Sequence, residues 1–160
     1  MRSRRRLVAF VALLGGLLVI PLGVVAWEEY RLSTGEHVVL RVQPVDPEDP
    51  FRGQYVALSY DITRAKTGGA SPGTTVYVPL HRRGKVWTGS RAVREKPDSG
   101  RFIRGRVGGF GIQYGIETFY VEEGQGPKYE DAIARGSIYA RVVLDDDGGA
   151  ELDDLTFEPG

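Results

Sequence analysis

The amino terminus constrains this chain more than any later stretch. Residues 1–6 include four arginines, and residues 7–26 form an unbroken run of apolar residues, glycines and one proline. About twenty apolar residues match the roughly 30 Å hydrocarbon core of a bilayer. The arginines precede this run, and positively charged flanks tend to remain in the cytoplasm. The sequence therefore predicts a cell-membrane protein: a cytoplasmic head and one transmembrane helix within residues 1–26, which contacts the membrane through residues 7–26, and an extracytoplasmic domain over residues 27–160.

A cleaved secretory signal is the alternative to this uncleaved anchor. The small residues at positions 24–26 would suit cleavage after Ala26. However, signal-peptide cores usually run about 7 to 15 apolar residues, whereas this run has twenty. Trp27 and Tyr30 follow it at the place where aromatic anchors rest at a membrane surface. The length and the aromatic residues together favour the anchor.

The remaining 134 residues are a normal size for one domain with one core. The chain has no cysteine, which excludes a lipid-modified cysteine anchor and a disulfide framework. Apolar burial must therefore stabilise the domain. Residues 27–160 carry seventeen basic and twenty-one acidic side chains, so their net charge gives no reason to expect nucleic-acid binding.

Charge is segregated along this domain. Residues 82–106 carry nine basic and two acidic side chains, whereas residues 107–160 carry three basic and twelve acidic ones. The two segments could face each other and neutralise their charges within the molecule. Alternatively, the basic segment could form a surface for anionic lipid or for a ligand that bears phosphate.

Short alternating runs broken by glycine and proline indicate β-structure after the anchor. Residues 36–42 and 54–62 each place apolar side chains on one face of a predicted strand. Residues 75–80 and 85–88 flank a turn at 81–84, which predicts a hairpin that packs valines beside Trp87. The apolar faces of the first two strands consist of Val38, Leu40, Val42, Val56, Leu58, Tyr60 and Ile62.

The next two predicted strands, residues 101–107 and 112–121, are joined by a loop that is short enough to force antiparallel pairing. If Val107 lies opposite Ile112, alternation assigns each side chain of the two strands to one of the two faces of the sheet. The apolar face would hold Ile103, Val107, Ile112, Tyr114 and Ile116, and the polar face Phe102, Arg104, Arg106, Gln113 and Glu117. On that polar face Arg104 and Glu117 would be diagonal neighbours.

The last third of the chain predicts one helix and a closing hairpin. Residues 127–135 begin with proline and are followed by Gly136, which is typical of a short helix. Residues 137–144 and 150–157 read as strands around an Asp-Gly turn. The predicted fold class is therefore all-β: a compact barrel or sandwich of about eight short strands with one short helix, preceded by a single transmembrane helix.

The segment at residues 44–60, PVDPEDPFRGQYVALSY, carries the most information. The spacing of its Gly53, Tyr55, Leu58 and Tyr60 resembles the signature of the GDYXXLXY family. A second block at residues 114–126 resembles the other characteristic segment of that family. The segment that precedes the signature is similar to the family as well, through Asp46, Asp49 and Arg52. In the second block the similar residues are Tyr114, Gly115 and Glu117, followed by Glu130.

The resemblance implies a bacterial, membrane-anchored protein with an extracytoplasmic domain of unknown activity, which in many cases accompanies a multi-spanning membrane protein. It carries over no catalytic residue. Gln54 stands where the signature has aspartate. A glutamine can form hydrogen bonds in a turn but cannot take up a proton, so we interpret this position as structural.

Alternation within the signature strand separates its aromatic residues. Leu58 and Tyr60 point to one side and Tyr55 to the other. We therefore expect the rings to hold the strand between two layers rather than to line one pocket. Ligand binding by the polar residues that precede the strand, Asp46, Asp49 and Arg52, is the alternative use of this block.

A serine-lysine protease is the first enzyme hypothesis. An anchor followed by a β domain with a glycine-led strand also resembles signal peptidase, with Ser33 as nucleophile and Lys66 or Lys85 as base. The only methionine of the chain is Met1. The Ser-Met pair that marks the nucleophile in that family is therefore missing.

A hydrolase with paired carboxylates is the second enzyme hypothesis. Two of the carboxyl groups of Glu117, Glu123 and Glu130 could act as general acid and general base if the pKa of one of them were raised. Acidic residues are abundant here, so solvated charge or a salt bridge to Arg104 is the simpler interpretation. His37 and His81 have no clustered partners, and residues 145–149 lack the alternating ligands of a calcium loop.

These patterns predict no catalytic site, no metal and no cofactor. The predicted function is a membrane-anchored extracytoplasmic binding or accessory domain, which supports a polytopic membrane protein or another envelope component. The alternative is an envelope hydrolase with a carboxylate-based or serine-lysine site. The candidate binding or motif residues are Asp46, Asp49, Arg52, Gly53, Tyr55, Leu58, Tyr60, Arg104, Tyr114, Gly115, Glu117 and Glu130.

Overall fold

A computed structural model describes residues 16–17, 19–24, 35–44 and 55–159. The chain divides into two compact units, Met1–Gly35 and Glu36–Gly160. In the first unit, residues 16–17 and 19–24 are helical and all are exposed. No helix among the described residues is long and apolar enough to cross a membrane. The predicted span at residues 7–26 falls largely outside the described residues.

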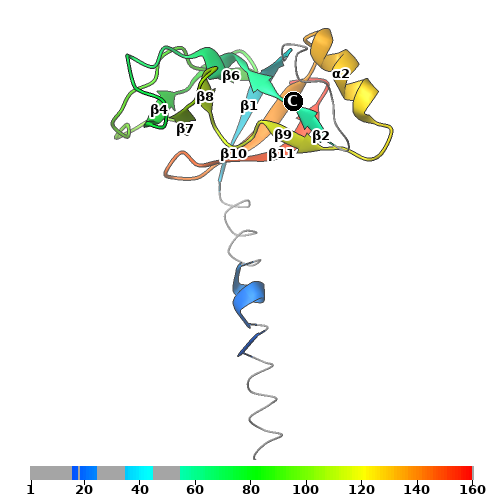
Figure 1. The fold of residues 1–160 in the computed structure, drawn as a ribbon, viewed down its shortest axis with the longest axis horizontal. Helices are drawn as coiled ribbons and strands as arrows, with labels where there is room; N and C mark the ends of the chain where they lie inside the picture. The colour runs from blue at the N-terminus through cyan, green and yellow to red at the C-terminus, as the bar shows by residue number, and fades with distance from the viewer. Residues whose placement is uncertain (1–15, 18, 25–34, 45–54, 160) are drawn as a thin grey trace, which may run out of the picture. The chain divides into compact units, whose positions relative to one another are not determined.

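The second unit is mostly β-structure (Figure 1). Its largest sheet has the strand order β11-β10-β1-β6-β5, and β3 pairs with the end of β1. The central strand β1 pairs antiparallel with β10 and parallel with β6. The strands of this sheet are β1 (Glu36–Gln43), β3 (Ser59–Tyr60), β5 (His81–Arg83), β6 (Val86–Thr88), β10 (Tyr139–Leu144) and β11 (Ala150–Thr156).

Two smaller sheets complete the described β-structure. One pairs β2 (Tyr55–Ala57) with β9 (Thr118–Tyr120), and the other has the order β4 (Thr75–Pro79), β7 (Phe102–Val107), β8 (Ile112–Gln113). The described residues thus form eleven strands in three sheets, and these sheets do not close into a barrel. The predicted barrel is wrong because two predicted strands break. In the described part of the first, residues 55–60 form β2 and β3, and the chain then enters the 3-10 helix η1 (Asp61–Arg64). The second, residues 112–121, becomes β8 and β9.

The predicted hairpin between residues 75–80 and 85–88 is also wrong. Residues 81–83 are extended as β5 and pair with β6, so the turn contains only Gly84 and Lys85. Gly84 has a φ of +67°, which this kind of two-residue turn requires. Strand β4 instead pairs antiparallel with β7, and Trp87 lies opposite Leu40 of β1.

The pairing of Val107 with Ile112 is confirmed, and the predicted apolar face of these strands is buried. Strand β8 ends at Gln113 because Gly115, with a φ of +86°, turns the chain. This turn moves Glu117 out of the strand. The predicted neighbour relation between Arg104 and Glu117 is therefore wrong, and no ion pair joins these two residues in the described part of the chain.

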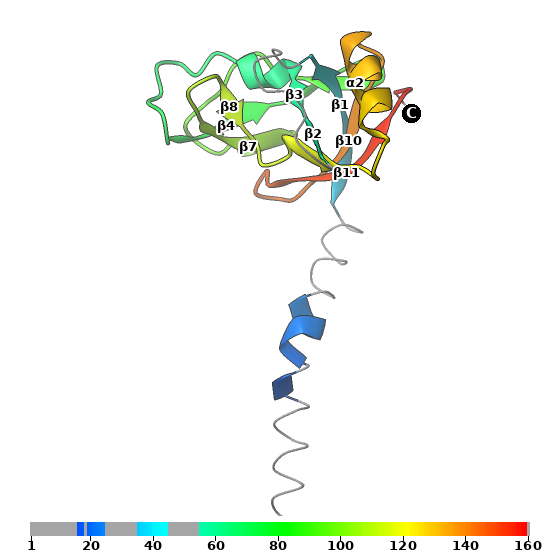
Figure 2. The same cartoon turned by 45° about the vertical axis from the view of Figure 1, so that its right-hand side comes forward.

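The predicted helix and the closing hairpin are both present. Helix α2 (Gly126–Ala134) contains proline in its first turn, and Gly136, whose φ is +64°, follows its C-cap residue Arg135. The N–H groups of Gly136 and Ser137 donate to the carbonyl oxygens of Ile133 and Ala132, which is a Schellman motif. Strands β10 and β11 form the hairpin around residues 145–149. Figures 1 and 2 both place α2 beside β2, where Ala132 and Ile133 are buried.

Candidate functional site

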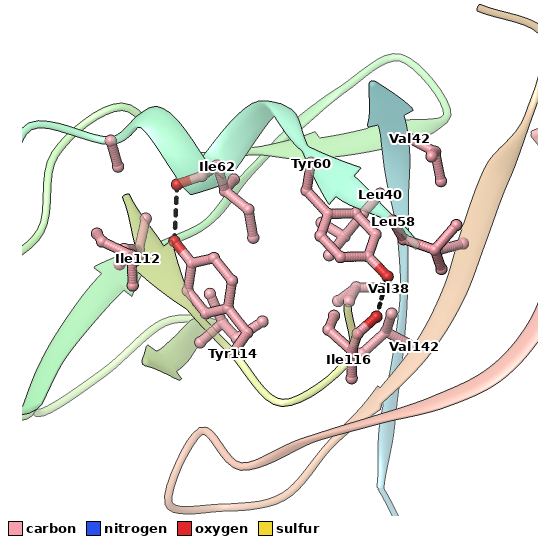
Figure 3. Packing of buried hydrophobic residues seen from close by; sticks show 14 of the residues in the cluster. Val38, Leu40, Val42, Leu58, Tyr60, Ile62, Ile112, Tyr114, Ile116 and Val142 are labelled. Carbon is pink, nitrogen blue, oxygen red and sulfur yellow. Dashed lines mark hydrogen bonds between the residues drawn. The ribbon is translucent and has the colours of Figure 1, made fainter. Parts of the chain in front are cut away.

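The fold brings the two family-like blocks together through two buried tyrosines. The hydroxyl of Tyr60 donates to the carbonyl oxygen of Ile116 at 2.5 Å, and the hydroxyl of Tyr114 donates to the carbonyl oxygen of Ile62 at 2.7 Å. Figure 3 shows that each hydroxyl is directed at the segment that carries the other ring. We call these four residues the tyrosine junction.

Local sequence explains why both tyrosines point inward. Val56, Leu58 and Tyr60 alternate onto the core face of β2 and β3, as predicted, and each is less than 5% exposed. Tyr114 follows β8 with the inward alternation of Ile112. A buried phenol needs a hydrogen-bond partner, and backbone carbonyls supply one to each ring.

The same burial sets the ionisation of the junction. Loss of solvent raises the pKa of both Tyr60 and Tyr114 well above the usual value for tyrosine, and the negative charge of Glu117 raises both pKa values further. The two hydroxyls therefore remain protonated donors throughout the physiological range. A phenolate nucleophile or base is not available from this pair.

Glu117 acts as a local cap. Its carboxylate accepts hydrogen bonds from the backbone N–H groups of Tyr114 at 2.5 Å and Gly115 at 2.9 Å. Its carbonyl oxygen accepts the N–H of Leu58 at 2.8 Å, beside the pairing of β2 with β9. Glu117 thus holds the turn that ends β8 and joins it to the signature strand, which is a structural use of this carboxylate.

Tyr55 lies on the opposite face of the signature strand, as predicted from alternation. It pairs in register with Tyr120 of β9, and the two rings form an edge-to-face contact with centroids 6.4 Å apart. Tyr55 is 38% exposed and Tyr120 is 77% exposed. The prediction that the rings hold the strand between two layers is therefore wrong: the outward ring belongs to a surface pair.

The other candidate residues do not assemble with the junction. Asp46, Asp49, Arg52 and Gly53 lie outside the described residues. Arg104 is an exposed residue of β7, opposite Tyr77, and its backbone N–H donates to Gly148. Glu130 is exposed on α2. Within the described part of the chain, no three histidine, aspartate or glutamate side chains are close enough to hold a metal ion.

A pocket with a volume of about 330 Å³ lies elsewhere, between residues 96–102 and the β10–β11 hairpin. Its lining includes Glu36 and Arg101, whose side chains form an ion pair at 2.6 Å. Neither Glu117 nor Glu130 contributes to it. No sequence motif marked this pocket, because it forms where a loop meets a hairpin that is distant in the chain.

Most residues of the basic segment 82–106 are exposed to solvent. Lys96 and Asp147, 2.7 Å apart, form an ion pair that joins the basic segment 82–106 to the acidic segment 107–160. Most arginines of the basic segment are exposed and belong to no described ion pair.

Comparison with known proteins agrees with the family resemblance of residues 44–60 and 114–126. The model of the GDYXXLXY protein family matches residues 17–155. The chain belongs to the GDYXXLXY family. No curated protein and no solved structure matched it. Of the residues that the family name spells, Tyr55, Leu58 and Tyr60 are described, and Leu58 and Tyr60 build the core around the tyrosine junction.

Proposed function

We propose that this GDYXXLXY protein is a membrane-anchored, non-catalytic domain on the extracytoplasmic side, where it supports a polytopic membrane protein or another envelope component. The observation that carries the proposal is the apolar surface of the amino-terminal helix. Leu17, Val19, Ile20, Leu22 and Val24 are each more than 60% exposed. A helix that is apolar on every side requires a nonpolar environment such as the bilayer.

The tyrosine junction supports the non-catalytic part of the proposal. The hydroxyls of Tyr60 and Tyr114 and the carboxylate of Glu117 are all bonded to backbone groups of the same domain. These groups stabilise the fold, so they are not free to bind a substrate. An accessory role also follows from the tether itself, because a membrane anchor holds the domain at a high effective concentration near any neighbour in the same bilayer.

Membrane extraction tests the anchor. We expect the full-length chain to remain in the membrane after alkaline carbonate treatment. The double variant Leu17→Arg with Ile20→Arg should release it, because each arginine at the centre of a span costs about 2.5–3.5 kcal/mol on the insertion scale. The matched control is Leu17→Ile with Ile20→Leu, which keeps the apolar character. Release of the unsubstituted chain would refute the anchor.

Orientation and partner need separate measurements. Protease added to intact spheroplasts should digest the domain, and protection until lysis would place it on the cytoplasmic side and refute the proposal. A photo-crosslinker at the exposed residue Tyr120 should then capture a polytopic membrane protein in living cells. Capture of only a second copy of the chain would replace the accessory role with self-association.

A further inference from the structure

The loop between β7 and β8 presents a fully exposed aromatic residue. Phe110 is 104% exposed, whereas Val107 and Ile112 at the base of the same loop are buried. The loop reads Gly108-Gly109-Phe110-Gly111, and the N–H of Gly108 donates to the carbonyl oxygen of Gly111 at 2.7 Å. Phe110 is thus the apolar end of a tight turn, which we call the hairpin tip (residues 108–111). Removing such a ring from water is favourable.

The hairpin tip has a rigid base. Gly111 has a φ of +145°, and a Cβ atom built on it would lie 2.5 Å from the carbonyl oxygen of Thr63. The backbone of the tip therefore rests directly against η1, and only glycine fits at this contact. Figure 2 shows this arrangement, with β8 below the short helix that follows β3. Phe110 projects from a fixed platform, so its exposure is a property of the fold.

Two arginines flank the tip. Arg64 directly follows Thr63, and Arg106 pairs in register with Gln113, one step from the base of the loop. Both arginines are exposed, and neither forms an ion pair with a described residue. An apolar ring on a loop whose neighbouring positions carry cationic residues suits the boundary between acyl chains and anionic headgroups.

We propose that the hairpin tip docks onto the bilayer, with Phe110 in the interfacial layer and Arg64 and Arg106 on anionic headgroups. This inference rests on the proposed membrane anchor. Nine residues, 27–35, separate the predicted span from β1, and they can extend at most about 30 Å. The domain therefore always remains near a lipid surface, which makes lipid the partner at the highest local concentration.

The chain offers a clean labelling experiment because it contains no cysteine. Gly109 has open space around its Cα and no left-handed φ, so Gly109→Cys can carry an environment-sensitive fluorophore next to Phe110. The control label is Ala134→Cys, an exposed position at the end of α2. The full-length protein is placed in nanodiscs of phosphatidylcholine alone, or of phosphatidylcholine and phosphatidylglycerol in equal parts.

We expect the label at position 109 to shift to the blue and to be quenched by spin-labelled lipid in the anionic nanodiscs only, while the label at position 134 stays water-exposed. Phe110→Ser should abolish the shift. Arg64→Gln and Arg106→Gln should each lower the docked-to-free ratio about fivefold. Tyr120→Ser and Arg83→Gln, an exposed aromatic residue and an exposed arginine elsewhere on the domain, should leave the ratio unchanged.

Three results would overturn the docking. The first is a label at 109 that stays water-exposed in anionic nanodiscs. The second is an equal shift in both lipid compositions that the arginine substitutions do not alter. The third is a shift that requires another membrane protein in the nanodisc, which would assign the tip to a protein partner. A chain that does not remain with the nanodisc refutes the anchor itself, so the two failures are distinguishable.

Discussion

Replacing the junction tyrosines with phenylalanine tests whether the signature region is a structural device. Tyr60→Phe and Tyr114→Phe keep each ring and its packing but remove one hydroxyl. The carbonyl oxygen of Ile116 or of Ile62 then loses its tyrosine partner in the core, where both residues are at most 2% exposed. An unsatisfied buried group costs about 1–3 kcal/mol. We therefore expect Tyr60→Phe to lower the free energy of unfolding by about 2 kcal/mol. Tyr114→Phe should cost less, about 1 kcal/mol, because the carbonyl oxygen of Ile62 still accepts the N–H of Ala65.

This loss converts into a measurable melting temperature. Unfolding entropy is about 2.1 cal/mol/K per residue near 60 °C, so a unit of about 125 residues should lose roughly 8 °C in Tyr60→Phe and roughly 4 °C in Tyr114→Phe. The two hydrogen bonds join the same two segments of chain. Once one bond is lost, the segments can relax, and the double variant should cost less than the additive value of about 3 kcal/mol.

The assay is urea and thermal unfolding of the full-length chain in one detergent, followed by near-ultraviolet circular dichroism. Tyr55→Phe and Tyr120→Phe are the matched controls, because these two rings lie on the surface. Their hydroxyls are open to water, so we expect changes within about 0.5 kcal/mol. If the junction variants changed no more than these controls, the reasoning that assigns Tyr60 and Tyr114 a structural role would be refuted.

Three further predictions follow from the same region. Burial raises the pKa of Tyr60 and Tyr114, so the contribution of these protonated hydroxyls to stability should be fully present below about pH 10. Above that pH the free energy of unfolding should fall by about 1.4 kcal/mol per pH unit for each tyrosine. In alkaline titrations, either Tyr→Phe variant should reduce this slope by the contribution of one tyrosine. Gly111→Ala should lower stability by about 2 kcal/mol in urea unfolding, whereas Gly109→Ala should leave it unchanged; equal effects would contradict the contact with η1. Glu117→Gln, which can accept only through its single amide oxygen, should cost about 1–2 kcal/mol and speed amide exchange at Tyr114, and normal exchange there would disprove the cap.

Side-chain alternation predicted much of what is buried. The inward sets around Tyr60 and around Ile112 are the buried ones, and Gly136 ends the helix that the sequence indicated. The signature spacing likewise led to the correct family. These features depend on residues close in sequence, where a period of two or a glycine after a helix has a direct steric meaning.

Strand pairing and strand breaks could not be obtained in this way. Residues 112–121 keep an apolar alternation across the turn at Gly115, so their periodicity does not reveal that the chain changes sheets there. Nor does it reveal that residues 81–83 would pair with β6 and leave β4 for β7. Pairing depends on which distant segments compete for the same edge, and a local pattern does not contain that information.

The amino-acid sequence by itself determined the apolar amino-terminal run, the inward or outward side of most strand residues, and the family of the chain. Tertiary structure alone decided that Tyr60 and Tyr114 bond to each other's segments, that Glu117 caps a turn instead of meeting Arg104, and that Phe110 projects from a platform on η1. The physical reason is that each of these contacts joins groups whose approach is set by the packing of whole sheets, whereas burial and turn formation are set largely by neighbouring residues along the chain.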